Sequence, residues 1–380
     1  MQTTKKTDGR SITHALTLKP EQVIEQVEKA DLKGRGGAHF PTAMKWRFTR
    51  EEKKKPKVLI CNADEGEPGT FKDRYILRHN PEALIEGIAI AAYAIGARRA
   101  YIYLRYEYQN LRPLLQETIY DYDFYLKYLN LQLDIFMGQG AYICGDETAI
   151  MNSIEGIRGE PRAKPPYPAR RGLFELPTCV NNVSTLTNVA FIMHPEIEWQ
   201  NLALFSVSGN VIRPGIYEYI QGVPAGRVIN ASKPKNTIKA LFFGAAGGCV
   251  PYIPDMTLDN ETVAEYKAFL GSFALIAVDE HQSIPHICKN IADFFVHESC
   301  GRCTPCREGN YQIQKLLQLL LDGKGNHEVL NRLRELSDFV TDCSFCGLGQ
   351  TSTNHLRTAL TYFEPEFDAL CMSKSMKTVI

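Results

Sequence analysis

Short apolar runs alternate with longer segments of helical periodicity in the first half of the chain. The pattern predicts strands at residues 58–62, 100–104 and 129–137, a helix at residues 82–97, and an amphipathic segment from residue 109. This alternation is typical of βαβ units that build a parallel sheet. We therefore expect an α/β fold for this part of the chain.

The pattern changes twice further along the chain. A helix is predicted within residues 148–154 and another at residues 181–193, separated by a proline- and glycine-rich irregular loop at residues 156–177. Residues 205–248 are β-rich, with a hairpin expected at residues 207–219. Helical periodicity returns from residue 284 and predicts a compact bundle of helices at residues 291–296, 311–321, 329–340 and 353–363.

Composition and charge exclude several classes of protein. The chain has 380 residues, 44% of them apolar and 23% charged, which fits two or three globular domains. Basic and acidic residues both number 43, so no overall field favours nucleic acid. The first 20 residues lack the apolar stretch of a secretory signal. The apolar run at residues 87–97 is too short to span a membrane. We expect a cytoplasmic protein without a direct membrane span.

Five of the eleven cysteines lie between residues 300 and 346, and four of them are candidates for one cluster. Cys300, Cys303 and Cys306 form a C-x2-C-x2-C run, and Cys343 and Cys346 follow after a predicted helical hairpin. Three closely spaced thiolates plus one distant thiolate are typical of an iron-sulfur cluster. Cys346 is the preferred fourth ligand, with Cys343 in reserve.

Structural zinc is the alternative interpretation of this cluster. Zinc also accepts four thiolates, but it is usually held by paired C-x2-C knuckles, which this spacing does not match. The other six cysteines stand alone in the sequence and are expected to be small buried apolar residues: Cys61, Cys144, Cys179, Cys249, Cys288 and Cys371.

A glycine-rich loop and an acidic turn are candidates for ligand binding. The loop at residues 34–41 allows close approach of a flat or phosphorylated ligand, although a flexible surface loop is the alternative. The acidic turn at residues 61–67 follows the first predicted strand, where open α/β sheets place their ligands. Asn62 and Asp64 could bond the polar edge of a flavin ring, and a solvated turn is the alternative.

Two further segments could recognise phosphate groups. Asn181, Asn182 and Thr185 lie at a predicted helix start, where backbone amides favour anions, although simple capping also explains the asparagines. The proline-rich loop carries basic side chains that could receive a second phosphate-bearing ligand such as NADH: Arg158, Arg162, Lys164, Arg170 and Arg171. Its P-x-x-P spacing could instead form a polyproline ligand.

These motifs together resemble one family of electron-transfer proteins. The segments GRGGAHFPTAMKW, CNADEGEPGTFKDR, GAYICGDETA, RGEPRAKPPYPA, TCVNNVSTL and ESCGRCTPCREG occur in the family's order across about residues 30–365. They resemble the flavin- and NADH-binding subunit of bacterial respiratory complex I. They also resemble its relatives in NAD-linked hydrogenases and formate dehydrogenases.

The resemblance implies three domains and three cofactors. It implies a Rossmann-like domain for FMN and NADH at residues 1–200, a ubiquitin-like β-grasp domain at residues 201–280, and a helical bundle with a 4Fe-4S cluster at residues 281–380. It places at FMN Gly34, Arg35, Gly36, Lys45, Asn62, Asp64, Glu65, Tyr142, Gly145, Asn181, Asn182 and Thr185. It places along NADH Phe40, Phe48, Glu67, Glu147, Lys164 and Tyr167, and it makes Cys300, Cys303, Cys306 and Cys346 the cluster ligands.

The chain departs from the family pattern at four positions. His39 stands where glycine is usual, Asp146 replaces the first of two glutamates, Tyr167 replaces phenylalanine, and Ser184 replaces glutamate. Asp146 is still counted among the cofactor-binding residues. His39 adds bulk and a titratable group beside the expected flavin.

The resemblance implies an NADH dehydrogenase in which the cofactors carry the chemistry. The protein would align NADH with FMN, no acid-base residue would be needed, and single electrons would leave through the 4Fe-4S cluster. The implied partners are a thioredoxin-like 2Fe-2S subunit and further iron-sulfur subunits, which could attach the protein to a membrane. The alternatives are the diaphorase subunit of a soluble hydrogenase or formate dehydrogenase, and a non-enzymatic iron-sulfur scaffold.

Overall fold

The computed structural model describes residues 2–372 and divides the chain into two compact units. The first unit comprises residues up to 66 and residues 71–203, and the second comprises residues 67–70 and those from 204 onward. Among residues 2–372, no helix has both the length and the apolar character that a membrane crossing needs.

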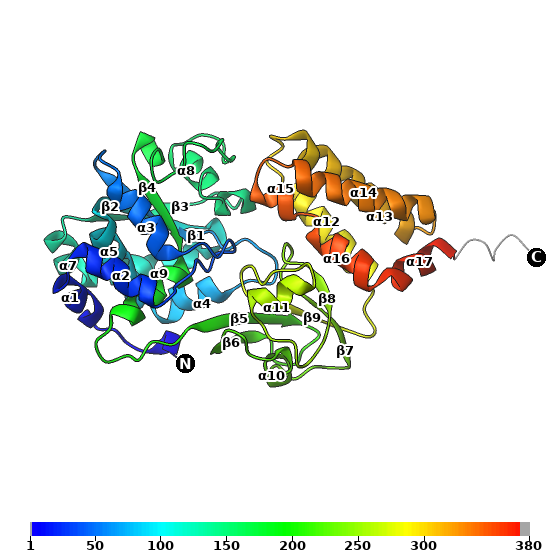
Figure 1. The fold of residues 1–380 in the computed structure, drawn as a ribbon, viewed down its shortest axis with the longest axis horizontal. Coiled ribbons are helices and arrows are strands. Elements are labelled where there is room, and N and C mark those ends of the chain that lie inside the picture. The colour runs from blue at the N-terminus through cyan, green and yellow to red at the C-terminus, as the bar shows by residue number, and fades with distance from the viewer. Residues whose placement is uncertain (1, 373–380) are drawn as a thin grey trace, which may run out of the picture. The chain divides into compact units, whose positions relative to one another are not determined.

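The first unit is built on a four-stranded parallel sheet of order β3-β2-β1-β4 (Figure 1). Its strands are β1 (Lys57–Ala63), β2 (Ala97–Leu104), β3 (Gln132–Met137) and β4 (Thr178–Asn182). Nearly every residue of β1 is buried, as expected of a parallel strand covered on both faces. The sheet is therefore of the α/β, Rossmann-like type that the alternating pattern predicts.

Nine α-helices accompany this sheet in the described part of the first unit. They are α1 (Arg10–Leu16), α2 (Pro20–Lys29), α3 (Thr42–Glu51), α4 (Lys72–His79), α5 (Pro81–Ile95), α6 (Arg112–Asp121), α7 (Asp123–Tyr128), α8 (Ala149–Ile154) and α9 (Val183–Met193). Helix α5 is apolar on all sides and almost wholly buried, so it forms the centre of the unit.

Local sequence signals set the ends of α5. The side chain of Asn80 accepts a hydrogen bond from Ala83 N, and Pro81 occupies the first helical position. Gly96 ends the helix in the left-handed region at φ 78°. These signals fix a 15-residue helix that packs along α9.

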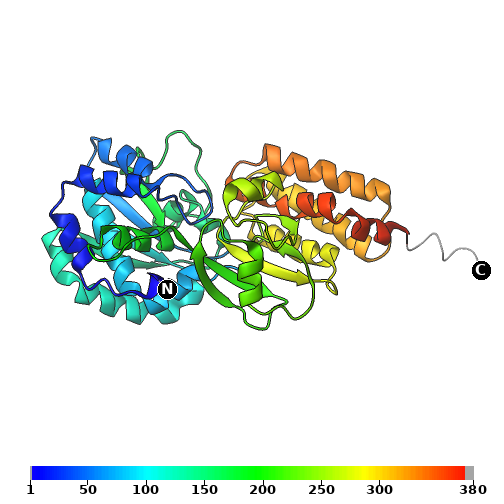
Figure 2. The same ribbon diagram turned by 60° about the horizontal axis from the view of Figure 1, so that its bottom comes forward.

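The second unit contains a five-stranded mixed sheet of order β6-β5-β9-β7-β8 (Figure 2). The strands are β5 (Leu202–Gly209), β6 (Gly215–Ile220), β7 (Ile238–Phe242), β8 (Cys249–Pro251) and β9 (Ala274–Asp279). Strand β9 runs parallel to β5 and antiparallel to β7. Two short helices, α10 (Ala225–Ala231) and α11 (Asn260–Glu265), belong to the same segment of the chain.

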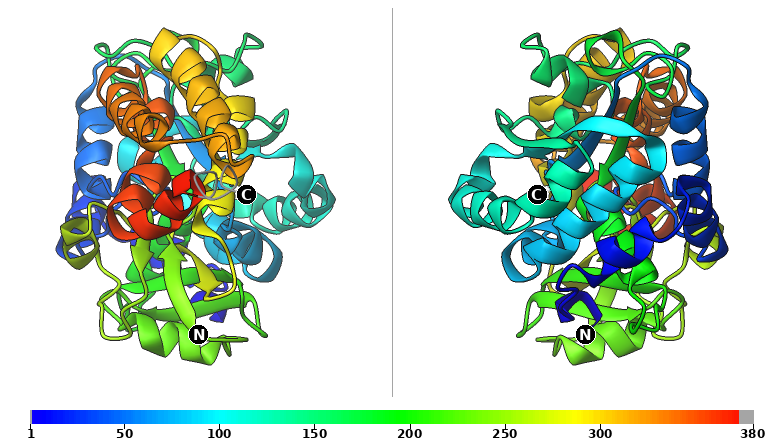
Figure 3. Two further views of the ribbon diagram at one scale, coloured as in Figure 1. Left: turned by 90° about the vertical axis from the view of Figure 1, so that its right-hand side faces the viewer. Right: turned by 90° about the vertical axis from the view of Figure 1, so that its left-hand side faces the viewer.

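The remaining helices follow the sheet in sequence. They are α12 (Ile284–Glu298), α13 (Asn310–Leu321), α14 (His327–Cys343), α15 (Gly347–Thr351), α16 (Asn354–Tyr362) and α17 (Glu364–Met372). Helix α13 packs against α12 and α14, and α16 packs against both α12 and α14 (Figure 3). Each of the four carries a buried apolar stripe, as mutual packing requires.

Most predicted elements are confirmed to within a few residues, but the sequence pattern misses helices α1 to α4 and strands β4, β8 and β9. At β4 the pattern predicts a helix start at residues 181–182 and no strand, whereas residues 178–182 pair with β1. Asn181 and Asn182 resemble a helix cap in sequence, which leaves only residues 178–180 as an apolar run, too short to predict a strand. The three predicted domain boundaries stay predictions.

Candidate functional site

One large cavity opens at the carboxyl edge of the parallel sheet. Its volume is about 1110 Å³, above the roughly 300–1,000 Å³ typical of a pocket for one small molecule. Parallel pairing sets Asn62 at the end of β1 directly beside Asn182 at the end of β4. The chain passes from β1 to β2 and β3 on one side of β1 and then adds β4 on the other side, so the strand order reverses between β1 and β4. Open α/β sheets bind ligands at such a point.

Many of the predicted cofactor-binding residues line this cavity. The glycine loop, helix α3, both strand ends, the turn before α8 and the proline-rich loop all contribute. The predicted residues found in the lining are Gly34, Gly36, Phe40, Lys45, Phe48, Asn62, Gly145, Asp146, Glu147, Lys164, Tyr167, Asn181 and Asn182. Long stretches of sequence separate these segments, so only the fold brings them together.

Three aromatic side chains of the lining are unusually exposed. Phe40 is 40% exposed, Phe48 51% and Tyr167 61%. Exposed rings at a concave surface can stack on a planar ligand, which would remove apolar area from water. This arrangement fits a flat heterocycle.

A charged triad lies in the same lining. Glu147 Oε1 is 2.6 Å from Lys164 Nζ, and Glu147 Oε2 is 3.4 Å from Lys45 Nζ. Burial alone would raise the pKa of Glu147, but the two ammonium groups together hold it below its usual value. Two ammonium groups, those of Lys45 and Lys164, therefore face the cavity from one side, and their N–H groups suit a phosphate-bearing ligand.

The asparagines at the ends of β1 and β4 are held by the protein itself. Asn62 donates from Nδ2 to Gly145 O at 2.9 Å and accepts from Asp64 N at 3.0 Å. Asn182 accepts from Ser184 N at 2.9 Å, so it caps α9 as the sequence suggested. These bonds fix the amides before any ligand arrives, which lowers the entropy cost of binding.

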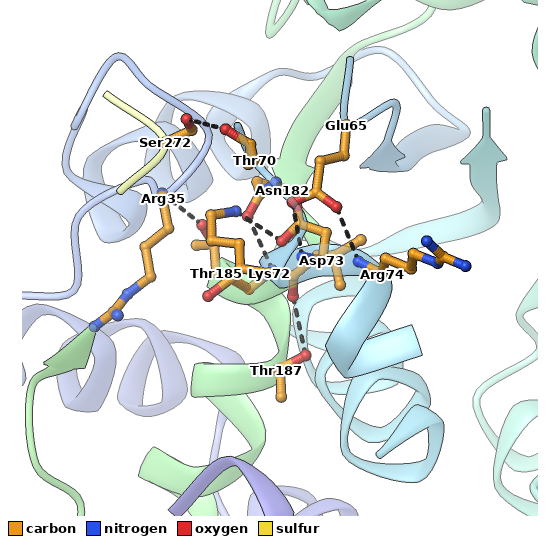
Figure 4. Close-up of polar contacts among 12 residues, drawn as sticks. Arg35, Glu65, Thr70, Lys72, Asp73, Arg74, Asn182, Thr185, Thr187 and Ser272 are labelled. Atoms are coloured by element: carbon orange, nitrogen blue, oxygen red, sulfur yellow. Dashed lines mark hydrogen bonds and ion pairs between the residues drawn. The ribbon is translucent and has the colours of Figure 1, made fainter. Parts of the chain in front are cut away.

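A buried ion pair that the sequence did not reveal supports Asn182. Lys72 Nζ lies 2.7 Å from Asp73 Oδ1, and both side chains are almost completely buried. Asp73 Oδ2 accepts a hydrogen bond of 2.6 Å from Asn182 Nδ2 (Figure 4). In sequence, adjacent opposite charges at a helix start resemble ordinary surface residues, so no local signal distinguishes this pair.

Glu65 lies beside this pair rather than in the cavity lining. Its carboxylate accepts from Asp73 N at 2.8 Å and from Arg74 N at 3.0 Å (Figure 4). It also accepts from Tyr108 Oη at 3.0 Å. Burial, followed by the charge of Asp73, raises the pKa of Glu65 from its usual 4.5 to about 7. Lys72 and the two backbone N–H groups act in the opposite direction without cancelling this effect.

The raised pKa of Glu65 makes folding stability depend on pH. The folded protein holds this proton more tightly than the unfolded chain, so the contribution is complete below pH 4.5 and is lost as pH rises through about 7. We expect the melting temperature to fall between about pH 5 and pH 8, and Glu65→Gln to remove part of that fall. Thermal melts of both proteins at the two pH values measure this, and identical slopes would contradict the assignment.

Several residues that were predicted to bind a cofactor do not line the cavity, and the structure shows what Arg35, Thr185 and Glu67 contact instead. Arg35 turns its guanidinium onto the Leu202 carbonyl and Asn201 Oδ1, while its backbone N–H donates to Thr185 Oγ1 at 2.9 Å. Glu67 accepts from Ser272 Oγ at 2.8 Å and Ala246 N at 3.1 Å within the second unit. Roles at FMN or NADH stay predictions for these residues and for Asp64 and Tyr142.

The structure shows what two of the departures from the family pattern, His39 and Asp146, do locally. His39 lines the cavity with φ 50°, a left-handed conformation that glycine adopts more readily. Asp146 Oδ1 accepts from Thr148 N at 2.8 Å and Ala149 N at 3.0 Å, so its side chain caps α8. The imidazole of His39 therefore adds bulk to the loop, and the carboxylate of Asp146 is bonded to the start of α8.

The cysteines of the predicted cluster gather in the second unit. Cys306 is buried, Cys300, Cys303 and Cys346 are half-buried, and Cys343 is exposed. Burial, together with the nearby Cys303, Cys346 and Cys300, raises the pKa of Cys306 to about 11. The fold thus places Cys346 close enough to the C-x2-C-x2-C loop for its charge to affect the pKa of Cys306. Within residues 2–372, no three His, Cys, Asp or Glu side chains are arranged around a single-ion site.

Comparisons with known proteins agree with both halves of this description. Residues 27–191 match the Nuo51 FMN-binding domain, and residues 286–370 match the NADH-ubiquinone oxidoreductase-F iron-sulfur binding region. The chain is 39% identical over 375 residues to an F-type subunit of the NADH-quinone oxidoreductase of Rhizobium meliloti (strain 1021), covering 92% of this chain and 89% of that protein. The chain belongs to the family of NADH-quinone oxidoreductase F-type subunits.

A second member of this family and a solved relative extend the comparison. The F-type subunit of the NADH-quinone oxidoreductase of Streptomyces coelicolor (strain ATCC BAA-471 / A3(2) / M145) is 39% identical, covering 93% of this chain and 84% of that protein. A crystal structure of an NAD+-reducing [NiFe]-hydrogenase in the H2-reduced state matches with a TM-score of 0.90 and 38% identity. That match covers 96% of this chain but only 64% of the hydrogenase chain.

Proposed function

We propose that this protein is the NADH-oxidising subunit of a multi-subunit oxidoreductase, with FMN and NADH in the cavity of the first unit and a 4Fe-4S cluster on Cys300, Cys303, Cys306 and Cys346. The observation that carries the proposal is the cavity itself, because one lining combines exposed aromatic rings, fixed amides and the ammonium groups of Lys45 and Lys164. Family membership supports the same function.

The residues present fit both cofactors. The cavity exceeds the usual size for one small molecule, which suits a flavin and a nucleotide together. Lys45 and Lys164 supply charge for phosphate groups, and Phe40, Phe48 and Tyr167 supply ring faces. Cys306 receives a hydrogen bond from Asn310 Nδ2 at 3.5 Å, as sulfur ligands of clusters commonly do.

The protein's own contribution would be binding and alignment. When bound, FMN would supply two-electron acceptance from NADH and one-electron release, which a 4Fe-4S cluster can carry onward. The lining residues would hold the nicotinamide ring against the flavin plane and keep the pair in register. No side chain of the lining is needed to move a proton.

The proposal extends to the type of each domain, the partner subunits and the cellular location. The parallel central pair β5 and β9 supports a ubiquitin-like β-grasp for the sheet of the second unit, and α12 to α17 would form the cluster-bearing bundle. Electrons would pass to a thioredoxin-like 2Fe-2S subunit and further iron-sulfur subunits. The protein would be cytoplasmic, with any membrane attachment through those partners.

The second candidate is the diaphorase subunit of an NAD-linked hydrogenase or formate dehydrogenase. The likeness to the NAD+-reducing hydrogenase structure favours it specifically. The two candidates share the chemistry of this chain and differ in the final electron donor or acceptor. Purification of the native complex and identification of its other subunits separates them.

We expect the purified protein to contain about one FMN and four irons per chain and to reduce an artificial one-electron acceptor with NADH. Flavin fluorescence after denaturation, iron analysis and acceptor reduction measure the three quantities. Zinc in place of iron would exclude the cluster, and absence of both flavin and NADH-dependent activity would exclude the proposed function.

A further inference from the structure

The indole of Trp46 holds the side chain of a cavity residue. Trp46 lies on α3, is 0% exposed, and donates from Nε1 to Asn181 Oδ1 at 3.0 Å. Cys179 Sγ donates to the same oxygen at 3.3 Å. Burial raises the pKa of Cys179 to about 12, so its thiol keeps the proton that it donates. Two donors from the protein interior therefore converge on one amide oxygen.

These donors determine which end of the Asn181 amide is available to a ligand. An indole N–H can only donate, so the Asn181 atom that faces Trp46 must be the oxygen. Asn181 borders the cavity, and its Nδ2 has no hydrogen-bond partner among residues 2–372. The NH2 group is thus the polar end left for the cavity.

The neighbouring lining has the same polarity. The Asn182 oxygen accepts a hydrogen bond from Ser184 N, and its NH2 group donates one hydrogen to Asp73. The second hydrogen of that NH2 group is left for a ligand. Lys45 Nζ, which lies 3.2 Å from Val180 O on the same strand, can also only donate. The wall at the end of β4 therefore offers donors, which suit an acceptor oxygen of a phosphate or a ring carbonyl.

We propose that Trp46 is a positioning residue that fixes Asn181 with its NH2 group toward the cavity, so that this wall recognises an acceptor atom of FMN. The proposal rests on the proposed function, because FMN is taken as the ligand. Without the indole N–H, the amide loses its main orienting partner and can turn its oxygen toward the ligand. Two acceptors would then face each other.

The chain offers a matched control for this test. Trp199, the second of its two tryptophans, donates from Nε1 to Asn188 Oδ1 at 3.1 Å, and neither residue lines the cavity. Trp46→Phe and Trp199→Phe each delete one indole-to-asparagine hydrogen bond while keeping an aromatic ring. Only in the first does the asparagine border the cavity.

The experiment compares FMN dissociation from the purified holoproteins by flavin fluorescence on dilution. We expect Trp46→Phe to raise the FMN dissociation constant roughly fivefold to tenfold, as loss of one hydrogen bond predicts, and Trp199→Phe to leave it unchanged. The KM for NADH should change little in both. Equal weakening in the two variants would indicate general destabilisation and overturn the proposal.

A double-mutant cycle separates positioning from packing. If Trp46 acts through Asn181, adding Trp46→Phe to Asn181→Ala should weaken FMN binding no further. In Asn181→Asp both side-chain ends are oxygens, so Trp46→Phe should again add nothing. Additive losses would overturn the positioning role. Wild-type affinity in Trp46→Phe overturns this inference alone, whereas a wild-type protein without FMN overturns the proposed function as well.

Discussion

Cys346→Ala is expected to abolish the 4Fe-4S cluster, whereas Cys343→Ala should leave it largely intact. Cys346 lies within electrostatic reach of Cys306, and Cys343 is exposed at the end of α14. A cube-shaped cluster has four corners to ligate, and the loop from Cys300 to Cys306 supplies three thiolates. Only one further thiolate is needed.

The surroundings of Cys346 allow it to approach the loop closely. A Cβ on Gly349 would lie 3.1 Å from Cys306 Cβ and 2.5 Å from the Ser344 side chain, so the chain after Cys346 runs against the first ligand loop. Only glycine fits that approach without displacing its neighbours. This close backbone approach brings the segment that carries Cys346 to the three other thiolates.

Iron content and low-temperature EPR of the dithionite-reduced variants measure the outcome. Iron should fall from about four atoms per chain to near zero in Cys346→Ala, and the cluster signal should disappear. Direct reduction of artificial acceptors by NADH should survive, because the cavity residues belong to the other unit. An intact signal in Cys346→Ala with loss in Cys343→Ala would reverse the assignment of the fourth ligand.

Gly87→Ala is expected to destabilise the first unit severely. A Cβ at Gly87 would lie 1.9 Å from the carbonyl oxygen of Leu186, because α5 and α9 are in backbone contact there. Alanine in place of glycine normally stabilises a helix by about 1 kcal/mol. Here the clash is with backbone, so the helices must separate, at a cost of about 3 kcal/mol or more.

Thermal unfolding measures this prediction. For a unit of this size we expect the midpoint to fall by roughly 6–12 °C. Since α9 begins directly after Asn182, displacement of α9 should also weaken FMN binding. Gly215→Ala is the control, because nothing lies within 4 Å of a Cβ at that position. A melting temperature indistinguishable from that of the wild type in Gly87→Ala would contradict the close packing of the helices.

The alternation of apolar runs and helical segments was enough to predict strands β1, β2 and β3 and the longer helices from α5 onward, but it did not predict α1 to α4. Elements such as α5 carry their own signals, with Asn80 and Pro81 at the start and Gly96 at the end. Strand β4 was missed because Asn181 and Asn182 at its end resemble a helix cap in sequence, and only pairing with β1 shows that they also end a strand.

The chemistry of the candidate site was partly readable in the same way. The spacing of the cysteines indicated an iron-sulfur cluster, because such a cluster needs four thiolates. The order of the flavin- and NADH-binding motifs indicated which segments line the site. The exposed rings at Phe40 and Tyr167 border one cavity with Glu147 and Lys164, as the motifs suggested. Whether each residue contacts a cofactor is a matter for the experiments above.

The sequence by itself determined the fold class, the elements with a clear periodic pattern and the kinds of side chain available for cofactors, since these depend on local patterns and on motif order. Only the tertiary structure decided that Lys72 and Asp73 lie buried behind Asn182, that Trp46 holds Asn181, and that Arg35 turns toward Asn201. Each of these contacts joins residues far apart in the chain or buries charges that look solvated in sequence. Orientation and burial are properties of packing between distant segments, and no local pattern encodes them.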